Sequence, residues 1–295
     1  MPPTTDSATS PATNSVKGDS MRATALFFFC LLIAVPALSP QTSAPRAFLG
    51  FDRNDYPGDA ALPILRKSFS FAGYWLSPFP GGNSNSWSGK RELLRSQGFG
   101  FALLFAGPTS GQLRDEPYTL KRVAEDTRTA AAAARREGFS PGSVIFLDVE
   151  EGGRLPRTYF TYLKLWASEL SSLGFRAGIY CSSTPIDEGE GPTLITSDFI
   201  RKQIEPTKLV FWVYNDACAP SPGCVVPQNP PPPSKSGIPY ARIWQYVRSP
   251  RDRKTATHCS GYAKNGNCYP PGDKAGSWFL DINTSSSPDP SGGNK

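Results

Sequence analysis

The amino-acid sequence predicts an α/β fold, an irregular (β/α)8 barrel of the TIM type in a single domain. Apolar segments typical of strands alternate with amphipathic segments typical of helices between residues 47 and 283. Eight segments are strand-like, and several of them are apolar throughout, as parallel strands covered on both faces require. About 250 residues remain once the N-terminal segment is set aside, a length that suits one such barrel.

The first half of the chain supplies the clearest strand–helix units. The Ala-rich segment 119–137 and the segment 156–173, which places its large apolar residues on one stripe, are typical of amphipathic helices. We expect strands at 47–52, 71–76, 101–105 and 143–150, and helices at 59–67, 89–97, 119–137 and 156–173.

The second half is less regular. We expect strands at 176–181, 209–215, 241–246 and 278–283, with a helix at 195–205. No clear helix precedes either of the last two strands, since a Pro-rich loop and a Cys-containing loop stand in those places. The barrel is therefore expected to be irregular there, and a doubly wound open sheet is the structural alternative.

Composition excludes several classes of protein. The 295 residues are 39% hydrophobic with a net charge of +6, values that exclude a disordered chain. The Gly residues have no period of three, no heptad pattern persists, and only one stretch approaches the length of a membrane span. A sequence pI near 9.0 suits an anionic partner such as a cell-wall polymer, although dispersed basic residues are also typical of a solvated surface.

The N-terminal segment 1–44 is interpreted as an extension and a signal peptide. Met21 and Arg22 precede an apolar run of 16 residues, 23–38, which is short for a ~20-residue membrane span and is followed by small residues. We expect a secreted, periplasmic or cell-envelope protein, associated with a membrane only if this segment is not cleaved. Translation from Met1 and from Met21 both remain open. The barrel is expected over 45–284 and a disordered polar tail over 285–295.

Cysteine usage agrees with export. Two pairs stand in loop-like sequence, and each pair could close its own loop as a disulfide, but the sequence leaves the pairing open. Cys181 is left over and is expected to be a buried thiol. A single His, at position 258, does not favour a Cys/His zinc site, so no metal and no cofactor are expected. The pairs are Cys218 with Cys224 and Cys259 with Cys268.

Four acidic residues stand at the ends of expected strands. Parallel strands of a barrel bring their carboxyl ends to one face, so these acids are expected to meet in one cleft. Crowded carboxylates raise one another's pKa, and a protonated acid beside ionised ones is the condition for cleaving a glycosidic bond. The alternative is that each acid only caps the following loop. The four are Asp52, Asp148, Glu150 and Asp281.

Aromatic and amide side chains also stand at strand ends. Trp75, Tyr180, Tyr214 and Gln245 are candidates for contacts with sugar rings and hydroxyls. Trp212 and Trp244 are better explained as core residues. The sequence contains no phosphate-cradling Gly loop, nucleotide fingerprint or nucleic-acid motif, so neither a nucleotide nor a nucleic acid is expected as a partner.

Several short motifs occur in an order that resembles a known family. Gly-Phe-Asp52, Asp148-Val-Glu150, Gly-Ile-Tyr180, Phe-Trp212-Val, Trp244-Gln245-Tyr246 and Asp281-Ile-Asn283 resemble the glycoside hydrolase family 25 muramidases. Gly73-Tyr-Trp75, the Ala-rich helix and Gly178-Ile-Tyr-Cys-Ser-Ser are more similar to the bacterial glycoside-hydrolase-like domain called domain of unknown function 1906.

The resemblance implies a barrel that acts on, or binds, peptidoglycan or a related cell-wall polysaccharide. It implies that Glu150 is the general acid, with Asp52, Asp148 and Asp281 flanking it, and that Asn283 lies at the substrate site. The segments around Trp75 and at 101–107 depart from the muramidase pattern. Fold similarity does not carry activity with it, so a catalytically silent barrel that binds glycan and a metal-dependent hydrolase remain as alternatives.

Overall fold

The computed structural model describes residues 46–189, 191–205, 208–218, 230–247 and 280–294, with the main chain alone at 216–218 and 247. All described residues belong to one compact unit, Ser43–Lys295. The expected signal segment and the cysteines expected to form disulfides lie outside the described side chains. No helix in the described ranges is long and apolar enough to cross a membrane.

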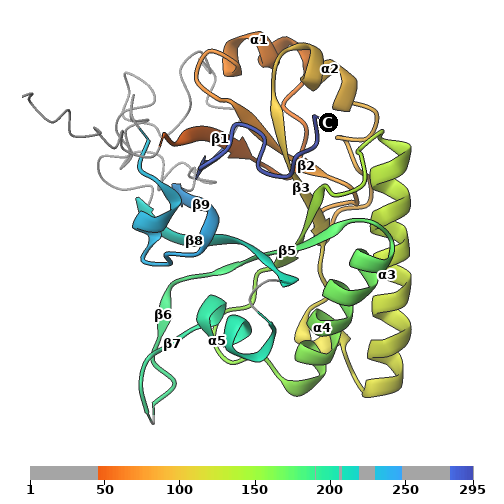
Figure 1. Cartoon of the computed structure of the whole chain (residues 1–295), viewed down its shortest axis with the longest axis vertical. Coiled ribbons are helices and arrows are strands. Elements are labelled where there is room, and N and C mark those ends of the chain that lie inside the picture. Colours follow the sequence, from red (N-terminus) through yellow and green to blue (C-terminus); the bar gives the residue numbers. More distant parts are fainter. Residues whose placement is uncertain (1–45, 190, 206–207, 219–229, 248–279, 295) are drawn as a thin grey trace, which may run out of the picture. The chain divides into compact units, whose positions relative to one another are not determined.

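Eight of the described strands close into a barrel, which confirms the predicted fold class (Figure 1). Every neighbouring pair is parallel except the two pairs that involve β10. Around the barrel the strands are β1 (Phe48–Asp52), β10 (Asp281–Ser285), β9 (Ala241–Val247), β8 (Val210–Cys218), β5 (Arg176–Ser182), β4 (Val144–Val149), β3 (Gly100–Ala106) and β2 (Phe71–Trp75).

Helices cover the outside of the barrel. The two longest, α3 and α4, run alongside one another on one side of it (Figure 1). The Asp115 carboxylate caps α3 by accepting a hydrogen bond from the Tyr118 amide at 2.7 Å. The helices are α1 (Leu62–Leu65), α2 (Arg91–Ser96), α3 (Glu116–Arg136), α4 (Arg157–Ser172) and α5 (Thr196–Gln203), with single 3-10 turns at Asp59–Ala61, Ser110–Gln112 and Pro233–Ser236.

The direction of the last strand differs from the expectation. A parallel strand was expected at 278–283, whereas β10 covers Asp281–Ser285 and pairs antiparallel with both β1 and β9. An apolar run reads the same in either direction, so the sequence pattern carries no information on strand polarity.

A short hairpin also escaped the sequence pattern. Strands β6 (Pro185–Ile186) and β7 (Leu194–Ile195) pair antiparallel between β5 and α5. Two-residue strands are too short to show a period of two, and Gly and Pro residues predict only a loop here. The hairpin contacts the segment that follows β4, as described below.

The expectation of a disordered tail over 285–295 is wrong for residues 285–294. Ser291 bridges the first residues of two strands: its amide donates to the Phe101 carbonyl at 2.8 Å, and its carbonyl accepts from the Val144 amide at 2.9 Å. Its hydroxyl accepts from the Leu103 amide at 2.9 Å. Because β10 is antiparallel, it returns the chain to the amino ends of the parallel strands, where these main-chain groups need partners.

Candidate active site

Two of the predicted acids lie directly opposite one another on neighbouring strands. Asp52 is the last residue of β1 and pairs with Asp281, the first residue of β10. The antiparallel direction of β10 places its first residue at the carboxyl end of the parallel strands. Asp281 therefore reaches the expected end of the barrel, although by the opposite strand direction from the one predicted.

A glycine makes space for Asp52. A Cβ atom on Gly73 of β2 would lie 2.4 Å from the Asp52 Cβ atom, so no larger residue fits there without a shift. Asp52 is then oriented by Asn283, whose amide nitrogen donates to its Oδ1 at 2.6 Å. The Asn283 side-chain oxygen accepts a hydrogen bond from the Trp212 indole nitrogen at 2.9 Å. Asn283 and Trp212 are fully buried, so this chain of hydrogen bonds supports Asp52 from inside the barrel.

Asp148 occupies a buried position in the same barrel. It lies in β4, pairs with Tyr180 of β5, and is only 5% exposed. Burial raises the pKa of Asp148 well above its usual value, and the neighbouring charge of Glu150 raises it further. No hydrogen bond to the Asp148 carboxyl comes from the described residues.

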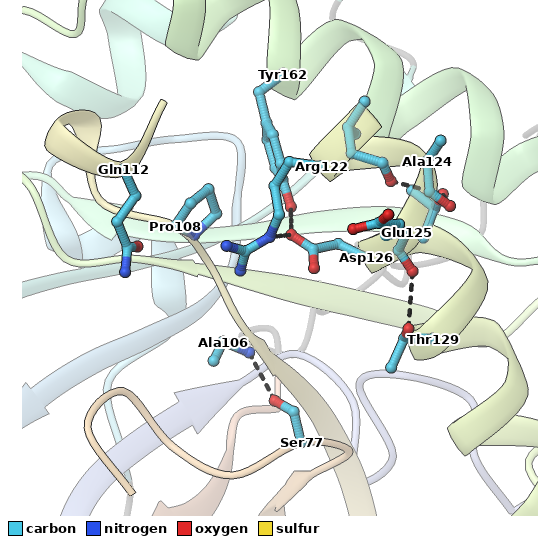
Figure 2. Close-up of polar contacts among 12 residues, drawn as sticks. Ser77, Ala106, Pro108, Gln112, Arg122, Ala124, Glu125, Asp126, Thr129 and Tyr162 are labelled. Carbon is cyan, nitrogen blue, oxygen red and sulfur yellow. Dashed lines mark hydrogen bonds and ion pairs between the residues drawn. The ribbon is translucent and has the colours of Figure 1, made fainter. Parts of the chain in front are cut away.

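A contrasting buried acid lies in the helical layer. Figure 2 shows Arg122 of α3 and Tyr162 of α4 converging on the carboxylate of Asp126, each at 2.7 Å from its Oδ2. Burial raises the pKa of Asp126, while the Tyr162 hydrogen bond and the Arg122 charge oppose that rise. Asp126 is thus compensated by the two helices that it joins, whereas Asp148 is not.

Tyr180 connects three of the acids. Burial raises its pKa well above the usual value, and the charges of Asp52, Asp148 and Asp281 raise it further in that order. The strand register agrees, because Asp148 pairs directly with Tyr180 and Asp52 pairs with Asp281. The Tyr180 hydroxyl donates a hydrogen bond to Oε1 of Gln245 at 2.9 Å, so this predicted pair is joined.

Glu150 is placed differently from the other three acids. It follows the last residue of β4 and is exposed, whereas Asp52, Asp148 and Asp281 are 9%, 5% and 5% exposed. The Tyr214 hydroxyl donates to the main-chain carbonyl of Glu150 at 2.8 Å. The acids therefore form a buried group of three with one solvent-accessible member beyond the end of β4.

The predicted ligand-contacting residues are mostly buried. Trp75 is 4% exposed, and its indole nitrogen donates to the Arg53 carbonyl at 3.0 Å. Gln245 is 3% exposed, and Asn283 has no exposed surface. Tyr180 and Tyr214 are half-buried and stack on one another, with ring centroids 4.9 Å apart. The two tyrosines thus keep the greatest solvent access of the five.

Sequence reasoning did not identify Glu151. Its carboxylate accepts hydrogen bonds from both the amide and the hydroxyl of Ser110, in the loop between β3 and α3. The run of two adjacent glutamates was the available signal, but nothing in it indicates the partner. The expectation for Cys181 is confirmed, since this free thiol is fully buried.

The described part of the chain holds no group of three or more His, Cys, Asp or Glu side chains that could bind a metal ion. At the end of the barrel where the parallel strands finish it holds three buried carboxylic acids, with an exposed glutamate beyond the end of β4. This arrangement is typical of a glycoside-hydrolase-like barrel.

Comparison with known families agrees with that class. Residues 85–229 match the family model of the Rv2525c-like, glycoside hydrolase-like domain, so the resemblance predicted from the motifs is confirmed. The matched segment runs from the loop after β2 past the end of β8 and includes Asp148, Glu150, Tyr180 and Tyr214. No curated protein matches the sequence.

Solved structures with a similar fold include three of bacterial or phage origin. The Mycobacterium tuberculosis Tat-secreted protein Rv2525c, in complex with L-tartrate, is 15% identical with a TM-score of 0.46 over 81% of this chain and 95% of that one. The catalytic domain of the endolysin ply40 from bacteriophage P40 of Listeria monocytogenes is 15% identical, with a TM-score of 0.45 over 83% and 96%. The virulence factor GHIP of Streptococcus pneumoniae, a glycosyl hydrolase 25, is 14% identical, with a TM-score of 0.46 over 80% and 86%.

Proposed function

We propose that the protein is a secreted glycosidase that cleaves peptidoglycan or a related cell-wall polysaccharide by carboxylate acid catalysis. The observation that carries the proposal is that one exposed acid, Glu150, lies at the same end of the barrel as three buried acids, Asp52, Asp148 and Asp281, whose charges all act on Tyr180. Glycosidic cleavage needs a proton donor that reaches the leaving oxygen and negative charge beside the developing oxocarbenium ion.

In this proposal each acid has its own task. Glu150 is the proton donor, because it is the member of the group that reaches solvent and therefore a bound polymer. Asp52, held by Asn283, and Asp281 opposite it supply negative charge that stabilises the transition state. Asp148, with its raised pKa, is a carboxylic acid that donates a hydrogen bond to the substrate.

Export completes the proposal. The apolar run 23–38 is the secretory signal, and the Cys218–Cys224 and Cys259–Cys268 disulfides form after export. The N-terminal sequence of protein recovered from the culture medium or envelope, with a peptide map under non-reducing conditions, tests both points. Protein that keeps residues 1–44, or four alkylatable thiols in these pairs, would contradict them.

The experiment that tests the catalytic role compares wild type with Glu150→Gln on peptidoglycan, chitin-like polymers and other wall polysaccharides. New reducing ends are identified by mass spectrometry. We expect products from the wild type and a loss of at least about 100-fold in the variant, which cannot donate the proton. Glu125→Gln, an exposed glutamate of α3, is the matched control and should keep full activity. Equal turnover by wild type and Glu150→Gln would refute the role of Glu150.

A second candidate function is a barrel that binds cell-wall glycan without cleaving it. Burial of Trp75, Gln245 and Asn283 leaves the stacked Tyr180–Tyr214 pair as the aromatic surface for a sugar ring. This function predicts polymer retention that survives neutralising both Asp148 and Glu150, together with no product from the wild type.

A further inference from the structure

The main-chain carbonyl of Glu150 is hydrogen-bonded by a residue from a strand that does not neighbour β4. Glu150 lies one residue beyond β4, and the pairing of β4 with β5 ends at Val149. Its carbonyl oxygen accepts a hydrogen bond from the phenol of Tyr214 at 2.8 Å, and Tyr214 belongs to β8. The contact therefore crosses β5, the strand that separates β4 from β8 in the barrel.

Tyr214 is itself fixed at both its ring and its main chain. The ring stacks on Tyr180 at a centroid distance of 4.9 Å and an interplanar angle of 25°. Tyr180 is in turn held by its hydrogen bond to Gln245. The Tyr214 carbonyl accepts hydrogen bonds from the amide and the hydroxyl of Ser183 at 2.8 and 3.0 Å. The phenol hydroxyl is thus delivered to a defined place.

The residues that follow Glu150 are also anchored, on both sides of the segment. On one side Glu151 binds the loop between β3 and α3, and on the other the segment binds α5 and the β6–β7 hairpin. The Gly153 amide donates to Oγ1 of Thr196 at 2.8 Å, and Arg154 donates to Glu188 through its amide at 2.7 Å and its Nε at 3.0 Å.

We infer that Tyr214 is a positioning residue, whose phenol fixes the main chain of Glu150 and so sets where the Glu150 carboxylate is presented. The inference rests on the proposed function of Glu150 as the proton donor. A displacement of about 1 Å in a catalytic group can cost about 100-fold in rate, so a single hydrogen bond to its main chain is sufficient to matter. Burial raises the pKa of Tyr214 to about 12, so the phenol keeps its proton at neutral pH.

Tyr214→Phe in the full chain tests this directly, because it keeps the ring stack and removes the hydroxyl that donates to Glu150. We expect kcat on the cleaved polysaccharide to fall about tenfold or more, KM to change less than about threefold, and the pH profile of kcat to shift. Tyr74→Phe is the matched control: Tyr74 is a buried strand tyrosine whose hydroxyl donates to Glu137 at 2.6 Å in the outer layer. It should leave all three quantities unchanged.

A spectroscopic measurement separates this inference from the proposed function. In protein labelled with 13C at the glutamate carbonyls, Tyr214→Phe should shift the Glu150 carbonyl resonance, assigned with Glu150→Gln, and Tyr74→Phe should not. An unmoved resonance would overturn the inference, as would equal kcat losses in the two Phe variants. If the wild type releases no product, the proposed function fails, and the resonance alone decides whether Tyr214 holds Glu150.

Discussion

Asp126 and Asp148 are both buried acids, but their surroundings give them different consequences for stability. Asp126 receives hydrogen bonds from Arg122 and Tyr162, whereas Asp148 faces the charge of Glu150 without a compensating donor among the described residues. An acid whose pKa is raised in the folded protein stabilises the fold at low pH and loses that contribution as pH rises through the raised value. Ionised Asp148 therefore destabilises the protein.

Asp148→Asn should consequently stabilise the protein at neutral pH. We expect the free energy of unfolding, measured by urea denaturation at pH 8, to rise by about 1–2 kcal/mol relative to wild type. The difference should shrink as pH falls and vanish only below the ordinary aspartate pKa of 3.8, where Asp148 is protonated in both folded and unfolded chains. A variant less stable than wild type at pH 8, or a pH-independent difference, would contradict the assigned cause.

Asn283→Ala should act in the opposite direction. The substitution leaves the buried Trp212 indole without its Asn283 acceptor and removes the hydrogen bond that Asn283 donates to Asp52, so we expect a loss of about 2–3 kcal/mol in the free energy of unfolding. Asn294→Ala removes an amide at an exposed position and should cost about 0.5 kcal/mol or less. Equal losses in the two variants would contradict the bridging role of Asn283.

The segment after β10 packs against the end of the barrel where the parallel strands begin. Asp289 accepts hydrogen bonds from the amides of Phe101, Gly293 and Asn294 at 2.9, 3.1 and 2.9 Å. A Cβ on Gly100 would lie 2.0 Å from the Pro288 carbonyl oxygen, so β3 begins with a glycine where the tail passes closest. The glycine at position 100 thus leaves the space that the main chain of the tail needs.

Asp289→Ala should destabilise the barrel by about 2–3 kcal/mol, because three amides lose a charged acceptor. Asp187→Ala is the control, since Asp187 accepts from the Gly189 amide at 2.9 Å within the exposed hairpin and should cost about 0.5 kcal/mol or less. Thermal unfolding of the two variants checks the comparison. A Tm for Asp289→Ala that matches wild type would show that the tail is dispensable.

The order and approximate bounds of the larger elements were predictable, whereas strand polarity and the tail were not. The 3.6-residue stripe of α4 and the apolar runs of β3 and β4 depend on side-chain burial, which the sequence displays directly. The antiparallel direction of β10 depends on pairing between distant segments. The tail is ordered by hydrogen bonds between the main chain of β3 and β4 and both the main chain and the side chains of Asp289 and Ser291. Polar composition does not reveal these distant partners, so it gave the wrong prediction.

For the site, the acids were predictable because barrel topology gathers strand ends whatever their sequence separation. Their separate environments were not predictable. The sequence placed Asp148 and Glu150 together on one face, but the structure buries the first and exposes the second beyond the strand end. The Tyr214 hydroxyl binds a main-chain carbonyl, a group that every residue carries, so the sequence could not indicate this contact. The position of Tyr214 at a strand end indicated only a contact with a sugar.

The strands that the structure describes close into a barrel, with Glu150, the proposed proton donor, beyond the end of β4 and the tail bound at the first residues of β3 and β4. We propose that this barrel hydrolyses a glycosidic bond. Digestion of peptidoglycan in water enriched in heavy oxygen tests that proposal most directly. We predict fragments whose new reducing ends each carry one heavy oxygen, absent with Glu150→Gln. Fragments without the label would show bond cleavage that does not use water, and an absence of fragments across all the polysaccharides would show that the barrel is not a glycosidase.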